Sequence, residues 1–106
     1  MAKYLAKVSM TAEGMRALRQ EKASGRRAMV SHMFEAAGGK LEAFYYAFGQ
    51  DDLFIIADVP DNVSVASLSI LVNSAGLVHA SITPLLTVEE MDRAIDKAAG
   101  LTPPAR

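Results

Sequence analysis

Cysteine is absent from this sequence of 106 residues, so the chain forms no disulfide and offers no thiolate for catalysis or metal binding. Long apolar runs are absent too: the longest nearly apolar stretch, Leu53 to Ala57, is far too short for a membrane span or a signal peptide. Neither charge dominates, since 11 basic and 12 acidic side chains leave a net charge of −1, which gives no overall attraction to nucleic acid. We therefore expect a cytoplasmic protein whose partners include neither nucleic acid nor membrane.

Hydrophobic residues make up 51% of the chain, which is enough to bury one small core. The length fits one domain, and no linker, repeat or low-complexity segment divides it. We expect a single domain over residues 1–100, followed by a C-terminal tail at 101–106 that begins after Gly100.

Alternating apolar residues, caps and helix breakers predict seven elements. Strands are expected at 3–10, 40–48, 52–59 and 77–86, and helices at 12–37 (interrupted at Ser24-Gly25), from the cap Asp61 to about Ala75, and from Thr87 to Gly100. The last helix opens on a capping box, because Thr87 and Glu90 stand three residues apart. Pro84 argues that its strand lies at an edge of the sheet or contains a bulge.

This order predicts an α+β, ferredoxin-like βαββαβ fold, in which helices cover one face of a four-stranded antiparallel sheet, plus a C-terminal helix. A three-residue turn at 49–51 would place Tyr46 opposite Phe54, with Gly49 supplying a positive φ if the turn needs one. That register directs one apolar set toward the helices: Leu41, Ala43, Tyr45, Ala47, Leu53, Ile55, Ala57 and Val59.

The opposite, open face then carries an aromatic cluster of Phe44, Tyr46, Phe48 and Phe54 together with Ile56. Monomers rarely expose an apolar patch of that size. We therefore expect a second subunit to cover it, which gives a dimeric α/β barrel or a larger assembly of such dimers.

The segment Gly38-Gly39-Lys40-Leu41-Glu42-Ala43-Phe44-Tyr45-Tyr46-Ala47-Phe48-Gly49, followed by Asp52, resembles the signature of the GYD-domain family. Similar residues extend the resemblance over about residues 2–98. The motif departs at Asp51, where a tyrosine would be expected. The resemblance implies a ferredoxin-like fold and a dimeric α/β barrel, but it supplies no function, because the family's distant relatives range from cofactor-free oxygenases to ligand-sensing modules.

Polar residues on the predicted open face are the candidate site. Its expected ligand-binding residues are Lys7, Tyr46, Asp52, Phe54, His79 and Ser81. His79 is the candidate catalytic acid or base, or a haem ligand, and otherwise an interface histidine. Lys7 attracts an anionic ligand or pairs with Asp52 or Glu42. Asp52 caps the hairpin, orients a ligand, or acts as a base if it is buried.

Two further clusters of charged residues have simpler interpretations than a ligand site. The spacing of Glu42, Asp51, Asp52, Asp58 and His79 matches no metal motif, so we expect no metal, and no pattern identifies a cofactor. Five basic residues between positions 16 and 27 are expected to form a solvated helix face and kink: Arg16, Arg19, Lys22, Arg26 and Arg27.

The function favoured by the sequence is binding of a small, partly apolar molecule by an oligomeric domain. One alternative is a cofactor-independent enzyme of the dimeric-barrel type that acts on a small apolar or aromatic substrate, with His79 as acid or base. Another is a structural or accessory oligomer that docks on a larger protein partner. Two concave places are available, the interior between facing sheets and the gap between sheet and helices. The polar residues favour the interior.

Overall fold

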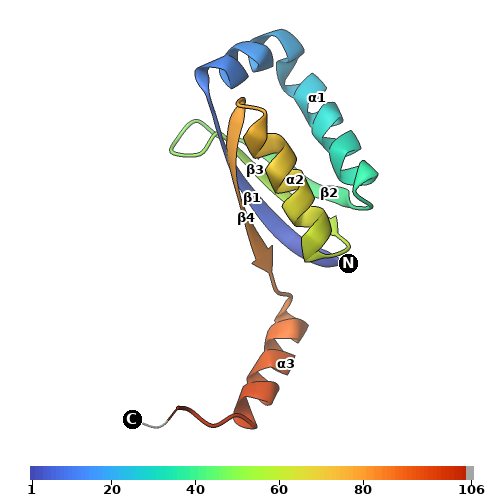
Figure 1. Cartoon of the computed structure of the whole chain (residues 1–106), viewed down its shortest axis with the longest axis vertical. Coiled ribbons are helices and arrows are strands. Elements are labelled where there is room, and N and C mark those ends of the chain that lie inside the picture. The colour runs from blue at the N-terminus through green and yellow to red at the C-terminus, as the bar shows by residue number, and fades with distance from the viewer. Residues whose placement is uncertain (105–106) are drawn as a thin grey trace.

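The computed structural model describes residues 1–104, so residues 105–106 of the expected tail lie outside the described part. Its elements are β1 (Ala2–Met10), α1 (Ala12–Ala36), β2 (Lys40–Tyr46), β3 (Leu53–Val59), α2 (Asn62–Ser74), β4 (Val78–Leu85) and α3 (Val88–Ala99). All paired strands are antiparallel, in the order β2-β3-β1-β4. The predicted α+β ferredoxin-like order is confirmed (Figure 1).

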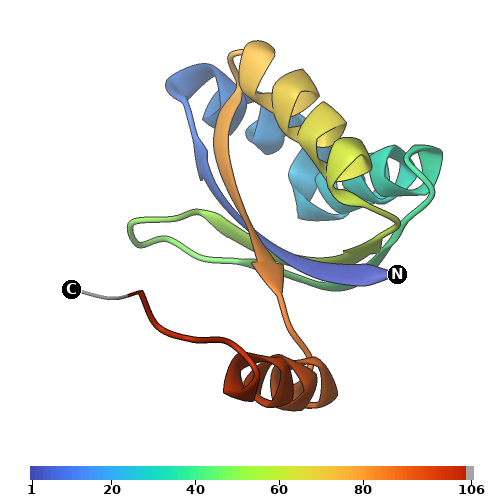
Figure 2. The ribbon, with the colours of Figure 1, turned by 60° about the horizontal axis from the view of Figure 1, so that its bottom comes forward.

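Both crossover helices cover the same face of the sheet, whereas α3 lies beyond its other side (Figure 2). The edge position of β4 explains Pro84, because an outer strand needs no second set of hydrogen bonds. No helix within residues 1–104 is long and apolar enough to span a membrane.

Helix starts follow the predicted caps. Asp61 accepts a hydrogen bond from the Ser64 backbone N–H at 2.8 Å, and Thr87 and Glu90 form the reciprocal capping box. The break in α1, however, falls at Lys22 and not at Ser24-Gly25. Lys22 has φ 69° and ψ 164°, a conformation that is almost restricted to glycine and costs about 1–3 kcal/mol.

The core lies between the sheet and the two covering helices. Alternate residues of β1 and β3 point into it, as predicted, and α1 and α2 supply the opposing side chains. The buried apolar residues are Tyr4, Ala6, Val8, Phe34, Leu53, Ile55, Ala57, Val59, Val65 and Leu68.

The predicted register of the β2–β3 hairpin is wrong by one residue. Tyr46 pairs with Leu53, and Tyr45 pairs with Phe54. A bulge between Leu41 and Ala43 shifts the pairing again farther along β2. The pairing turns Phe44 and Tyr46 toward the helices and leaves Tyr45 on the open face, so strict alternation failed where an extra residue enters the strand.

The hairpin loop is also longer than predicted, because β2 ends at Tyr46 and the Ala47 N–H donates to the Asp52 carbonyl at 2.8 Å. Gly49 does not have a positive φ, and a Cβ there would meet no atom within 4 Å. The turn therefore does not need a glycine at this position. Phe48, predicted on the open face, is fully exposed in the loop.

The amphipathic helix α3 stands away from the rest of the chain (Figure 1). None of its residues is buried, and its apolar Val88, Met91 and Ile95 are exposed. The radius of gyration is 16.7 Å, whereas a compact domain of this length has about 13 Å. Leu86 lies beyond β4 and is likewise exposed.

Candidate functional site

The open face brings four of the predicted site residues together. Lys7 on β1 lies opposite Phe54 on β3 and opposite Ser81 on β4, so these three form one row across the sheet. His79 lies two residues from Ser81 on the same face. Lys7, His79 and Ser81 are exposed and Phe54 is half-buried, so this row is a surface and not a pocket.

The expected pairing of Lys7 with Glu42 or Asp52 is absent within residues 1–104. On the open face it is Lys3 that forms ion pairs with carboxylates. Its Nζ lies 2.6 Å from Glu42 and 3.0 Å from Asp58. Hydrogen bonds from Lys3 to these two carboxylates raise its pKa. Lys3, which the sequence did not single out, therefore offsets one of the two negative charges of Glu42 and Asp58 on this face.

Asp52 and Tyr46 are used by the fold. The Asp52 carboxylate accepts a hydrogen bond from the Met10 N–H, and the Asp52 N–H donates to the Val8 carbonyl, both at 2.8 Å. These bonds tie the hairpin loop to the end of β1. Tyr46, expected on the open face, instead donates its hydroxyl to the Ala23 carbonyl of α1 at 3.0 Å.

The covered face contains a cavity of about 360 Å³ between the sheet, α1 and α2. Its walls come from every strand except β2 and from both helices. They are Ala6, Val8, Glu21, Arg26, Met29, Val30, Met33, Phe34, Leu53, Ile55, Leu68, Leu71, Val72, Ala75, Leu77, Val78, Ala80 and Ile82. All but Glu21 and Arg26 are apolar.

The cavity opens to solvent beside exposed lining residues of α1 and α2. Met29 of α1 and Leu71 of α2 both line it, and they are 44% and 56% exposed. Well-packed cores leave few voids larger than a water molecule, and a void of about 150 Å³ is enough to bind benzene. A cavity of this size therefore has room for a small organic molecule.

One ion pair supplies the polar groups of the wall. Arg26 is only 4% exposed, and its Nε and Nη2 donate to the two carboxylate oxygens of Glu21 at 3.1 and 2.9 Å. These hydrogen bonds hold the pKa of Glu21 below its usual range and raise that of Arg26. The expectation that Arg26 is solvated was therefore wrong.

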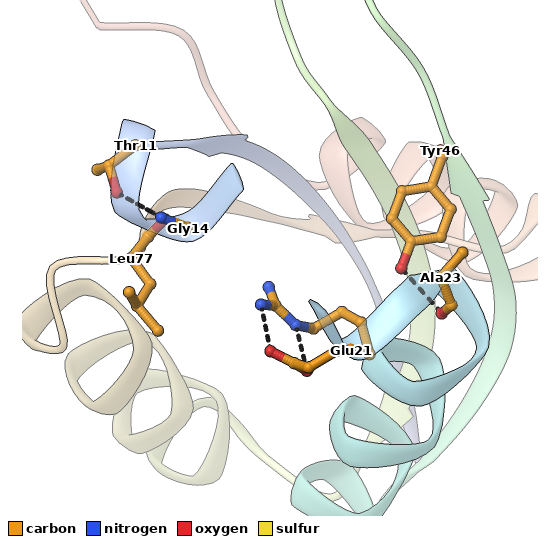
Figure 3. A network of polar contacts seen from close by, with 7 residues as sticks. Thr11, Gly14, Glu21, Ala23, Tyr46 and Leu77 are labelled. Carbon is orange, nitrogen blue, oxygen red and sulfur yellow. Dashed lines mark hydrogen bonds and ion pairs between the residues drawn. The ribbon is translucent and has the colours of Figure 1, made fainter. Parts of the chain in front are cut away.

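The strained kink in α1 makes this pair possible. Glu21 precedes Lys22 and Arg26 follows it, five residues after Glu21, which is beyond the usual helical spacing of three or four. Tyr46 braces the start of the second helical segment through Ala23, and burial raises the pKa of its hydroxyl. Figure 3 shows Glu21 and Tyr46 close to this turn of α1.

The other end of α1 closes the cavity against the turn before β4. The Thr11 N–H donates to the Leu77 carbonyl at 3.0 Å, and the Thr11 hydroxyl caps the helix at the Gly14 N–H (Figure 3). Gly14 is buried, and a Cβ there would lie 2.0 Å from the Leu77 carbonyl oxygen. Only glycine permits this approach.

Sequence reasoning missed Glu21 and Arg26, although one signal was available. Arg26 falls on the same helical stripe as the apolar residues Val30 and Met33. A charged residue on an apolar stripe needs a partner, and Glu21 is the acidic residue nearest before it. Among residues 1–104, no group of three or more potential ligands is placed to hold a metal ion.

The element order, the one-sided helix layer and the antiparallel sheet define a ferredoxin-like α+β domain. The model of the GYD-domain family matches residues 4–95, which is nearly the whole chain, and the protein belongs to that family. Neither a curated protein nor a solved structure matches it.

Proposed function

We propose that this protein is an oligomeric domain that binds a small, largely apolar molecule in the cavity between its sheet and its helices. The observation that carries the proposal is the cavity of about 360 Å³, which combines apolar walls with a single ion pair. Ligand sites commonly have volumes of about 300–1,000 Å³ and a few polar groups that fix orientation. We thus favour the gap between sheet and helices as the ligand-binding place, and not the interior between facing sheets.

A cavity-filling variant tests this assignment. Val72 lies on α2 and lines the cavity, so Val72→Phe places a ring inside it. Val63 lies on the same helix but is 79% exposed and does not line the cavity, which makes Val63→Phe the matched control. The probe is phenylnaphthylamine, a neutral fluorophore that brightens in apolar surroundings.

We expect Val72→Phe to weaken binding of the fluorophore at least about tenfold, since the ring occupies its space, while Val63→Phe binds like the unaltered protein. Circular dichroism should show both variants folded. Equal binding by both variants would place the fluorophore outside the cavity and contradict the proposal.

We also propose that the assembly partner is a second copy of the chain. Two apolar surfaces among the described residues lie on the same side of the sheet, namely the open face around Leu5, Phe54 and Ile56 and the exposed stripe of α3 (Figure 2). In a two-fold dimer each copy offers both surfaces to the other, so one symmetric contact can cover all four. Because α3 lies on the open-face side of the sheet, it is positioned to reach such a partner (Figure 2).

A further inference from the structure

Arg26 is the one charged residue among those described that is buried, and it lines an otherwise apolar cavity. A buried guanidinium requires a partner, and removing that partner is costly. For stability alone, apolar residues of similar volume serve as well as a buried ion pair. The position of this pair at the cavity wall therefore suggests a role in ligand recognition.

The backbone beside the pair is also under strain. Lys22 adopts a conformation that is almost restricted to glycine, and this turn is what lets Glu21 reach Arg26. A change in the Glu21 contact can relax Lys22 without moving the second segment of α1, which Tyr46 anchors at Ala23. Glu21 is thus the movable member of the pair and Arg26 the fixed one.

The exposure of the two side chains agrees with that division. The Glu21 side chain is 33% exposed and the Arg26 side chain 5%, so Glu21 can turn into water at little cost. Within residues 1–104, the hydrogen bonds of Arg26 involve Nε and Nη2 only, although a guanidinium has five N–H donors.

We infer that the ligand carries a carboxylate on an apolar body, and that this carboxylate replaces Glu21 as the partner of Arg26. The inference rests on the proposed function. A planar guanidinium binds a carboxylate through two parallel hydrogen bonds, which a neutral ligand cannot match. Replacement is favoured over simple addition, because a second carboxylate beside an intact pair would leave a net negative charge in an apolar site.

A matched pair of competitors tests the inference. Decanoate and decanol share one apolar chain and differ in the head group, and each is titrated against bound phenylnaphthylamine at neutral pH. We expect decanoate to compete at least about tenfold better than decanol, the difference that a charged hydrogen-bonded pair provides.

Two variants assign that preference to the ion pair. Glu21→Gln weakens the internal competitor of the ligand, so the factor by which decanoate competes better than decanol should rise several-fold. The double variant Glu21→Leu with Arg26→Met leaves no unpaired buried charge, and in it decanoate should no longer compete better than decanol.

The outcomes separate the two proposals. If decanol and decanoate compete equally in the unaltered protein and in Glu21→Gln, the carboxylate inference is wrong although the cavity binds apolar molecules. If neither competes, and Val72→Phe has no effect on the fluorophore, the cavity itself is not the binding site.

Discussion

The two faces of the sheet differ in how their polar groups are satisfied. On the covered face, Arg26 and Glu21 bind each other beside an apolar cavity, and the cavity is bounded by helices. On the open face, Lys7, His79 and Ser81 point into solvent around half-buried apolar residues. We propose that the covered face holds the ligand and that a second copy of the chain covers the open face. The polar residues that sequence patterns make most visible are thus not those that line the cavity.

We expect the largest loss of stability from a substitution on the covered face, where the start of α1 packs against the turn before β4. Gly14→Ala should lower the free energy of unfolding by about 3 kcal/mol, because its Cβ would lie 2.0 Å from the Leu77 carbonyl oxygen. Gly25→Ala in the same helix is the control, since its Cβ meets only Glu21 Cβ at 3.7 Å. Urea denaturation should show Gly25→Ala unchanged or slightly stabilised, and equal losses in both would refute the close approach.

A substitution on α3 tests whether this helix and the open sheet face mediate self-association. Ile95 is 59% exposed, so Ile95→Glu should leave the domain folded but weaken self-association at least about tenfold. Arg93→Glu introduces the same residue on the polar side of the helix and should have little effect. Light scattering over a concentration series measures both, and a monomer of 11.3 kDa in the unaltered protein would contradict self-association.

Two glycine substitutions near the kink in α1 should change the stability of the protein in opposite directions. Lys22→Gly should stabilise the protein by about 1 kcal/mol, because glycine accepts a positive φ without strain. Ser24→Gly, two residues later, should instead destabilise it by about 0.5–1 kcal/mol, as glycine does within a regular helix. Loss of stability in Lys22→Gly, measured by urea denaturation, would mean that the helix continues through this position.

Acid should lower the stability of the protein slightly, through the ion pair on the covered face. Arg26 lowers the folded-state pKa of Glu21 below its ordinary value of 4.5, so the pair stabilises the protein above that pH. This contribution is lost as the pH falls from 4.5 through the lower folded-state pKa. Glu21→Gln should therefore show a shallower decline of unfolding free energy in that range. An identical decline in both proteins would show that the pair does not contribute.

Sequence patterns predicted the fold where one rule governed each element. Alternation in β1, β3 and β4 gave the correct faces, and Asp61 and Thr87 gave the helix starts. They failed at β2, because a bulge changes which side chains share a face and leaves no mark in the alternation. Tyr46 consequently moved to the opposite side.

The candidate site was only partly predictable. Lys7, Phe54, His79 and Ser81 do share a face, since strand periodicity fixes it. The cavity depends on how far the two helices stand apart, a distance that no local pattern encodes. The Arg26 contact depends likewise on a backbone conformation at one lysine that sequence rules do not anticipate.

Methyl resonances of the protein during titration with phenylnaphthylamine test the central claim most directly, because the aromatic rings shift nearby methyl signals. Val72 and Ile82 line the cavity, whereas Leu5 and Ile56 lie on the open face. We predict saturable shifts at Val72 and Ile82 and none at Leu5 and Ile56. Shifts confined to Leu5 and Ile56 would place the ligand on the open face and contradict the account.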